Sequence, residues 1–232
     1  MEENKNFKIN PRFAINLSEY YKTFSYTPIL TGSKTITRIL SHFQFNTYEL
    51  KDNEITLKSS GPSHIHSHYQ DLFKGHEDYK MLMSAINPYK FFSSLFESKI
   101  YYNKELKPSN IKIPDLFNEF IFDNCYNTSC GYPQYNYVTN ISRTIDYIIK
   151  IETIEKDILT IPWVTDSHIN SIGGITKILN DKSVDNYTLS LTKFGFPEDC
   201  RSLYTQKTAD ILYKKYSKYF EVCGYDKDSW KI

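Results

Sequence analysis

The sequence predicts an α/β protein with a largely parallel central sheet flanked by helices. Apolar runs at residues 24–30, 79–86 and 146–152 have the length of strands, and each is followed by residues with helical spacing. A strand that is repeatedly followed by a helix is typical of parallel sheets. At 232 residues the chain is long enough for one large domain. We therefore predict a single domain over residues 1–232, with a polar lead-in segment at residues 1–22.

The first strand–turn–helix unit covers residues 24–43. Its apolar residues change to helical spacing at Ile36, Ile39, Leu40 and Phe43. The small-residue turn before this helix leaves backbone N–H groups free, and together with the helix dipole they favour an anion. The side chains of Ser33, Lys34 and Thr35 would add to such a site. An ordinary turn with a Ser/Thr cap explains the same pattern equally well.

The second unit begins with the compact apolar strand at residues 79–86. Asn87 is a good N-cap and Pro88 suits the first position of a helix. Tyr89, Phe92 and Phe96 then share one helical face, and Ser94 lies two turns into this helix. Parallel strands deliver their turns to one edge of the sheet, where ligands of α/β proteins bind. We therefore expect both helix starts to meet there.

The remaining elements are predicted from shorter patterns. Residues 45–57 alternate loosely around a turn at residues 51–53 and predict a hairpin or a second strand. Residues 100–114 and 124–140 are expected to be loops, with a helix over residues 116–122 between them. After the strand at 146–152 we expect a helix from Thr153 with Ile154, Ile158 and Leu159 facing inward. A long amphipathic helix over residues 205–223 should end at Gly224.

Composition excludes several classes of partner. Lysine and arginine (28) nearly balance aspartate and glutamate (27), so no global field favours nucleic acid or a membrane surface. No stretch approaches the roughly 18 consecutive apolar residues of a membrane span. The charged start of the chain lacks the apolar region of a secretory signal, which predicts a cytoplasmic protein. Cys125 and Cys130 lack partners for a zinc site, and free thiols are favoured over a disulfide between them.

Three of the six histidines, His64, His66 and His68, follow a Gly-Pro loop at a spacing of two residues. On a strand they would point the same way. Imidazole is a common metal ligand, but no carboxylate follows until Asp71. A catalytic histidine and a merely structural cluster are the other two interpretations, and no metal is expected.

The order of these pieces resembles the carbohydrate sulfotransferases of the Golgi type, family 2, in a microbial or viral form. That family holds the 5′-phosphosulfate of PAPS (3′-phosphoadenylyl sulfate) in a loop of the form PK-x-G-S/T-T/S. Residues 31–36, T-G-S-K-T-I, look like this loop. The family's second signature, R-[ND]-P-Y/F-x-R-x-x-S, holds the 3′-phosphate. Residues 86–94, I-N-P-Y-K-F-F-S-S, are similar to it.

Three later motifs continue the resemblance, which spans residues 24–228. Pro133-Gln134 resembles the family's PQ, and residues 146–152, D-Y-I-I-K-I-E, look like its D-Y-I-I-R-L-E strand. Residues 219–226, Y-F-E-V-C-G-Y-D, are close to its terminal D-F-E-x-F-G-Y-D. The resemblance implies a P-loop-like sulfotransferase fold, related to nucleotide kinases, and a location in the host-cell cytoplasm if the chain is viral.

The same resemblance implies the function and the site residues. The reaction would move a sulfuryl group from PAPS to a hydroxyl of a glycan or small-molecule acceptor, without a metal. His66 is the first choice for the base and His64 the second, because several members carry a histidine between the two phosphate motifs. The implied cofactor contacts are Thr31, Gly32, Ser33, Lys34, Thr35, Ile36, Asn87 and Ser94, and Lys34 also has a catalytic role.

Two departures from the family leave alternatives open. The loop lysine falls at Leu30 and the 3′-phosphate arginine falls at Ile86. Lys34 is expected to replace the lysine, and either Arg38 or Lys90 to replace the arginine. Without replacements the chain would be a catalytically impaired glycan-binding protein on the same fold. A P-loop phosphotransferase is the remaining alternative, since G-S-K-T resembles the end of GxxxxGK[ST] but lacks its upstream glycine.

Overall fold

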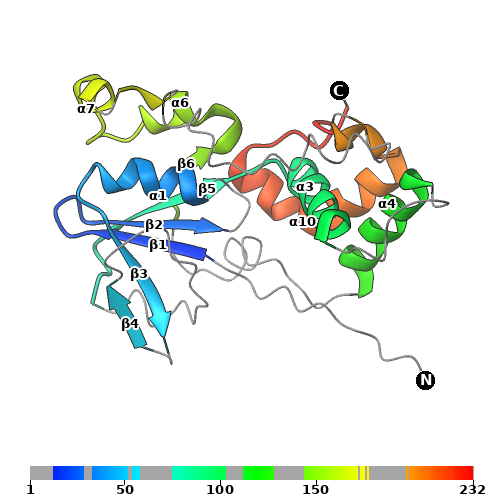
Figure 1. Cartoon of the computed structure of the whole chain (residues 1–232), viewed down its shortest axis with the longest axis horizontal. Helices are drawn as coiled ribbons and strands as arrows, with labels where there is room; N and C mark the ends of the chain where they lie inside the picture. Colours follow the sequence, from blue (N-terminus) through cyan, green and yellow to red (C-terminus); the bar gives the residue numbers. More distant parts are fainter. Residues whose placement is uncertain are drawn as a thin grey trace.

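The computed structural model describes residues 13–28, 33–51, 54–57, 75–102, 112–127, 144–171, 173–175, 177, 197 and 199–231. These residues form one mixed sheet with helices on one of its faces and a group of helices beside it (Figure 1). The α/β class predicted from the alternation of strands and helices is therefore confirmed.

The six-stranded sheet of the described chain has the order β4-β3-β1-β2-β5-β6. The strands are β1 (Phe13–Ser18), β2 (Thr23–Pro28), β3 (Asn46–Lys51), β4 (Glu54–Leu57), β5 (Lys80–Ala85) and β6 (Tyr147–Lys150). The expected parallel arrangement holds for β2, β5 and β6. Antiparallel strands β1, β3 and β4 extend the sheet on the β2 side, and β3 and β4 form a hairpin, which is one of the two alternatives predicted for residues 45–57.

The lead-in segment predicted for residues 1–22 is wrong in part, because β1 lies inside the sheet between β2 and β3. Asn16 and Ser18 of β1 are buried, and the Asn16 side-chain amide donates to Thr37 Oγ1 at 3.3 Å. The sequence of β1, F-A-I-N-L-S, places Phe13, Ile15 and Leu17 at alternate positions, which is a strand pattern that the prediction overlooked. Buried polar side chains need hydrogen-bond partners: Asn16 bonds to a residue distant in sequence, whereas Ser18 Oγ accepts from the nearby Tyr21 N–H at 3.2 Å.

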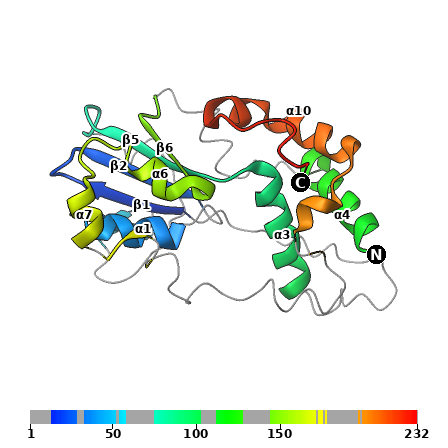
Figure 2. The ribbon, with the colours of Figure 1, turned by 90° about the horizontal axis from the view of Figure 1, so that it is seen from above.

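The helices form two groups. They are α1 (Ser33–Ser41), α3 (Pro88–Tyr102), α4 (Ile113–Phe122), α6 (Ile154–Ile158), α7 (Asp166–Ser171) and α10 (Gln206–Cys223). Helices α1, α6 and α7 lie on one side, whereas α3, α4 and α10 gather beyond the end of β5 (Figures 1 and 2). Strand β5 contributes to both cores: Leu82 packs with α1, and Met81 and Met83 pack with the α3 group. Burial on both faces explains the uninterrupted apolar run at this strand.

Helix α10 is confirmed almost to the residue. Thr205 caps it through a reciprocal contact with Thr208, and Gly224 ends it with a φ of 62°. A positive φ is readily adopted by glycine, which is why the sequence marks this end so clearly.

Other boundaries differ from the predictions. The strand predicted at residues 146–152 is shorter, because the 3₁₀ turn η3 (Ile151–Thr153) follows β6 directly. Helix α3 extends to Tyr102, into the predicted loop, and α4 begins at Ile113. Ile154 and Ile158 face inward as expected, but Leu159 is 46% exposed. Leu159 lies one residue beyond the end of α6 at Ile158, so it does not share the inward face of that helix.

Candidate functional site

The candidate site lies at the edge of the sheet where β2, β5 and β6 end. Strand β2 ends at Pro28 and α1 begins at Ser33, while β5 ends at Ala85 and α3 begins at Pro88. Strands β2 and β5 are parallel neighbours, with Tyr26 paired to Met83 near their ends. Both helix starts therefore reach the same edge, as the sequence predicted.

The first helix start is described only in part. Ser33 and Lys34 are the first two residues of α1, Thr35 is half-buried, and Ile36 is completely buried in the core. The Ile36 side chain therefore packs in the interior, and only its backbone is available to a ligand. Thr31 and Gly32 lie outside the described residues. So do Leu30, the histidines His64, His66 and His68, Asp71, Cys130, and Pro133-Gln134.

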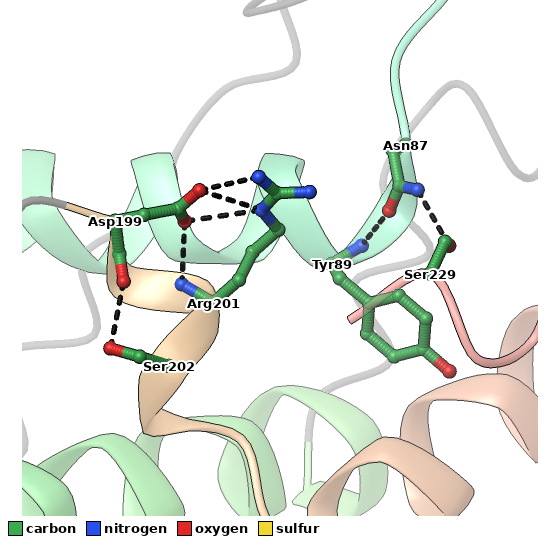
Figure 3. A network of polar contacts seen from close by, with 6 residues as sticks. All are labelled: Asn87, Tyr89, Asp199, Arg201, Ser202 and Ser229. Carbon is green, nitrogen blue, oxygen red and sulfur yellow. Dashed lines mark hydrogen bonds and ion pairs between the residues drawn. The ribbon is translucent and has the colours of Figure 1, made fainter. Parts of the chain in front are cut away.

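The second helix start is closed by its own cap (Figure 3). Asn87 Oδ1 accepts from the Tyr89 N–H at 2.9 Å, and the Asn87 carbonyl accepts from the Phe91 N–H at 2.8 Å. The predicted N-cap role of Asn87 is thus confirmed. The Asn87 N–H itself donates to Glu152 Oε1 at 2.9 Å. A carboxylate of the chain therefore already holds a backbone donor at this helix start.

Ile86, at the position of the family's 3′-phosphate arginine, is 5% exposed and packs in the core. Its backbone N–H donates to the Tyr219 hydroxyl at 3.1 Å, and that hydroxyl donates to the Ile86 carbonyl at 3.3 Å. The side chain at this position is therefore apolar and carries no charge.

Arg201 is the cation that sequence reasoning missed. It belongs to the 3₁₀ turn η5 (Cys200–Leu203), which packs along α3. Its Nε donates to both carboxylate oxygens of Asp199, at 3.1 and 2.9 Å, and Figure 3 shows the pair beside the first turns of α3. Burial alone would raise the pKa of Asp199, but hydrogen bonds from Arg201 hold that pKa below its usual value. The hydrogen bond to Asp199 raises the pKa of Arg201.

Four charged groups therefore gather around the start of α3. Glu152 acts on Arg201 through space, as Lys90 does on Asp199. Lys90 is exposed in the first turn of α3, and Ser94 is half-buried one turn later. Positions 87, 90 and 94 share one helical face, so Asn87, Lys90 and Ser94 lie on the same side of α3. Arg38 is exposed near the far end of α1.

Among the described residues, neither a cysteine nucleophile nor a metal site is supported. Cys125, Cys200 and Cys223 are free and buried. Burial raises the pKa of Cys125 to about 11 and that of Cys223 to about 12, so these thiols stay protonated and are poor nucleophiles. In the described ranges no cluster of three His, Cys, Asp or Glu side chains could hold a metal ion.

No described helix is both long enough and apolar enough to cross a membrane. Comparisons with protein-family models, curated proteins and solved structures give no match.

Proposed function

We propose that this chain is a PAPS-dependent sulfotransferase, with a P-loop-like sulfotransferase fold, that acts on a hydroxyl of a carbohydrate or related acceptor. The observation that carries the proposal is the convergence of two strand–turn–helix units on neighbouring parallel strands, β2 and β5. PAPS carries phosphate groups at both ends of its ribose. Two helix starts at one edge suit such a ligand, because helix N-termini favour anions.

Each of the two strand–turn–helix units is proposed to bind one end of the cofactor. The 5′-phosphosulfate is proposed to bind at residues 31–36, with Lys34 in place of the missing lysine. The 3′-phosphate is proposed to bind beside Asn87 and Ser94. Lys90 and Arg201 are the cations near that end. Arg38 lies five residues into α1, roughly 7.5 Å along the axis from its first residue, and suits neither end as well.

In the proposed reaction the acceptor hydroxyl attacks the sulfur in line with the bond to the leaving nucleotide. A new S–O bond forms as the bond between sulfur and the bridging oxygen breaks. The hydroxyl proton passes to His66, or to His64 as the second choice. The bridging oxygen gains negative charge, which Lys34 and the N-terminus of α1 are proposed to stabilise.

A second candidate function is glycan binding without catalysis. It is favoured by the closed cap of α3: Asn87 and Glu152 already occupy donors to which a phosphate would bind, and Asp199 already pairs with Arg201. On this hypothesis the acceptor surface is retained, and the nucleotide site is neutralised by the chain's own carboxylates.

Thermal unfolding with added nucleotide separates the two candidates. PAP (adenosine 3′,5′-bisphosphate) at about 100 times its Kd stabilises a protein by about 2.7 kcal/mol. For a chain of this size we expect the Tm to rise by roughly 5–10 °C. AMP, which lacks the 3′-phosphate, is the matched control and should shift the Tm less. Absence of any shift with millimolar PAP rejects the sulfotransferase proposal, and it favours the second candidate where the chain still binds a member of a glycan panel.

A further inference from the structure

The chain after α10 turns back over the candidate site. Residues 224–230, here called the C-terminal strap, contact both the end of β6 and the start of α3. The Lys150 ammonium donates to the Gly224 carbonyl at 3.2 Å and lies 4.9 Å from the centre of the Tyr225 ring. The Tyr89 hydroxyl, buried within α3's first turn, donates to the Lys227 carbonyl at 2.6 Å.

Asn87 is the point at which the strap meets the helix cap (Figure 3). Its side-chain Nδ2 donates to Ser229 Oγ at 2.7 Å, while its Oδ1 caps the helix. Ser229 in turn donates to the Asp226 carbonyl, within the strap. The amide of Asn87 is therefore held at both ends, by the strap through Nδ2 and by α3 through Oδ1.

Glu152 makes the second link between the strap and the helix start. One carboxylate oxygen accepts from the Asn87 N–H at 2.9 Å, and the other accepts from the Tyr225 hydroxyl at 3.0 Å. Burial, followed by the neighbouring Tyr219 and Glu152, raises the pKa of Tyr225, so its hydroxyl stays protonated and donates. Tyr225 also stacks on Tyr219, whose hydroxyl contacts both the N–H and the carbonyl of Ile86.

We propose that Tyr225 and Ser229 of the strap are positioning residues, which act through Glu152 and Asn87 to fix the place and direction of the first turn of α3. Only two residues, Ile86 and Asn87, connect β5 to α3, and the strap network contacts both. A small displacement of a binding group weakens a site far more than its own contact energy suggests. The idea that this turn binds a 3′-phosphate rests on the proposed function. The idea that the strap fixes the turn is independent of that function.

The test measures local amide exchange in Tyr225→Phe and Ser229→Ala. Each change removes one hydroxyl with little loss of packing. We expect exchange at the Asn87 and Tyr89 N–H groups to speed up about fivefold to tenfold, as for loss of one hydrogen bond. Exchange in the centre of α10 should stay unchanged. Ser229→Thr keeps the hydroxyl and should restore the slow exchange.

Matched controls remove the same groups elsewhere. Tyr79→Phe breaks a tyrosine–carboxylate contact with Glu19 that precedes β5, at the opposite edge of the sheet. Ser171→Ala removes a hydroxyl that donates to the His168 carbonyl at the end of α7. Neither control should change exchange at Asn87 or Tyr89.

The outcomes separate this inference from the proposed function. Unchanged exchange at Asn87 and Tyr89 in both strap variants overturns the positioning role, and so does faster exchange throughout the protein. Where exchange speeds up locally, PAP titration follows, with an expected threefold to tenfold weaker Kd in the variants and no change in the controls. Local change with wild-type PAP affinity supports the strap's hold on the turn and overturns the assignment of that turn to the 3′-phosphate. Local change in a protein that binds no PAP supports positioning by the strap and rejects the sulfotransferase.

Discussion

The cap of α3 gives the sharpest test of the structural argument, through Asn87→Ala. This change removes the Oδ1 that accepts from the Tyr89 N–H and the Nδ2 that donates to Ser229. Loss of an N-cap costs about 1 kcal/mol, and loss of the second hydrogen bond adds about 1 kcal/mol. We therefore expect the free energy of unfolding to fall by about 2 kcal/mol, and the Tm by roughly 4–8 °C for a chain of this length.

Two further substitutions at Asn87 separate the two contributions. Asn87→Ser keeps a capping oxygen but does not reach Ser229, so it should cost about 1 kcal/mol. Asn87→Asp also keeps the cap, and its charge is favoured by the helix dipole. That charge lies near the Glu152 carboxylate, which accepts from the same residue's N–H, so the net gain over serine should be small.

The assay is urea unfolding, in which a lower midpoint at constant slope reports a change in stability alone. Wild type should be the most stable, Asn87→Ser and Asn87→Asp intermediate, and Asn87→Ala the least stable. Asn87→Ala within about 0.5 kcal/mol of wild type, the ordinary range for surface substitutions, would refute the reasoning. Equal loss in the serine and alanine variants would show that capping contributes nothing here.

The other predictions concern catalysis and pH. Lys34→Ala should lower PAPS-dependent turnover by about two orders of magnitude, as loss of one transition-state contact does. Unchanged turnover would point to another cation. His66→Ala should abolish transfer while the Kd for PAP stays near wild type; if the loss is only a few-fold, the base is His64. In the wild type, kcat/KM should fall below about pH 6.5 as the histidine base becomes protonated. Burial raises the pKa of Glu97, so the folded chain holds its proton more tightly than the unfolded chain. Its ionisation therefore costs stability as pH rises through the folded pKa, and Glu97→Gln should stabilise the protein at pH 7 but not at pH 4; equal effects at both values would contradict this.

Local signals explain which parts of the fold could be predicted. A stretch of only a few residues is enough to predict the cap at Asn87, the continuous apolar run of β5 and the end of α10 at Gly224. Strand β1 also carries a local signal, since Phe13, Ile15 and Leu17 alternate, but the burial of Asn16 against Thr37 could not be predicted from that pattern. The position of β1 between β2 and β3 also depends on pairings that no local pattern encodes.

The candidate site was predictable to the same extent. Asn87, Lys90 and Ser94 share a helical face, which spacing alone indicates. Glu152 and Ser229 contact Asn87 across 65 and 142 residues of sequence, and no pattern near Asn87 predicts either contact. The sequence offered only Arg38 of α1 and Lys90 of α3 as replacements for the arginine missing at position 86. Arg201, a further cation beside α3, belongs to η5, which only tertiary packing brings to that helix.

The balance of charge at the start of α3 links the two candidate functions. Arg201 and Lys90 are matched by Asp199 and Glu152, so the site as folded has no excess of positive charge to attract an anion. Yet the Arg201–Asp199 pair is partly exposed, with 27% and 41% of the two side chains open to solvent. Exposed ion pairs contribute little to stability, so a doubly charged phosphate can take the place of Asp199 at Arg201 at small cost. Binding of PAP by such an exchange depends on Coulomb attraction in solvent and should weaken steeply with added salt. A nucleotide that bound with the same affinity at low and high salt would therefore be held by something other than Arg201 and Lys90.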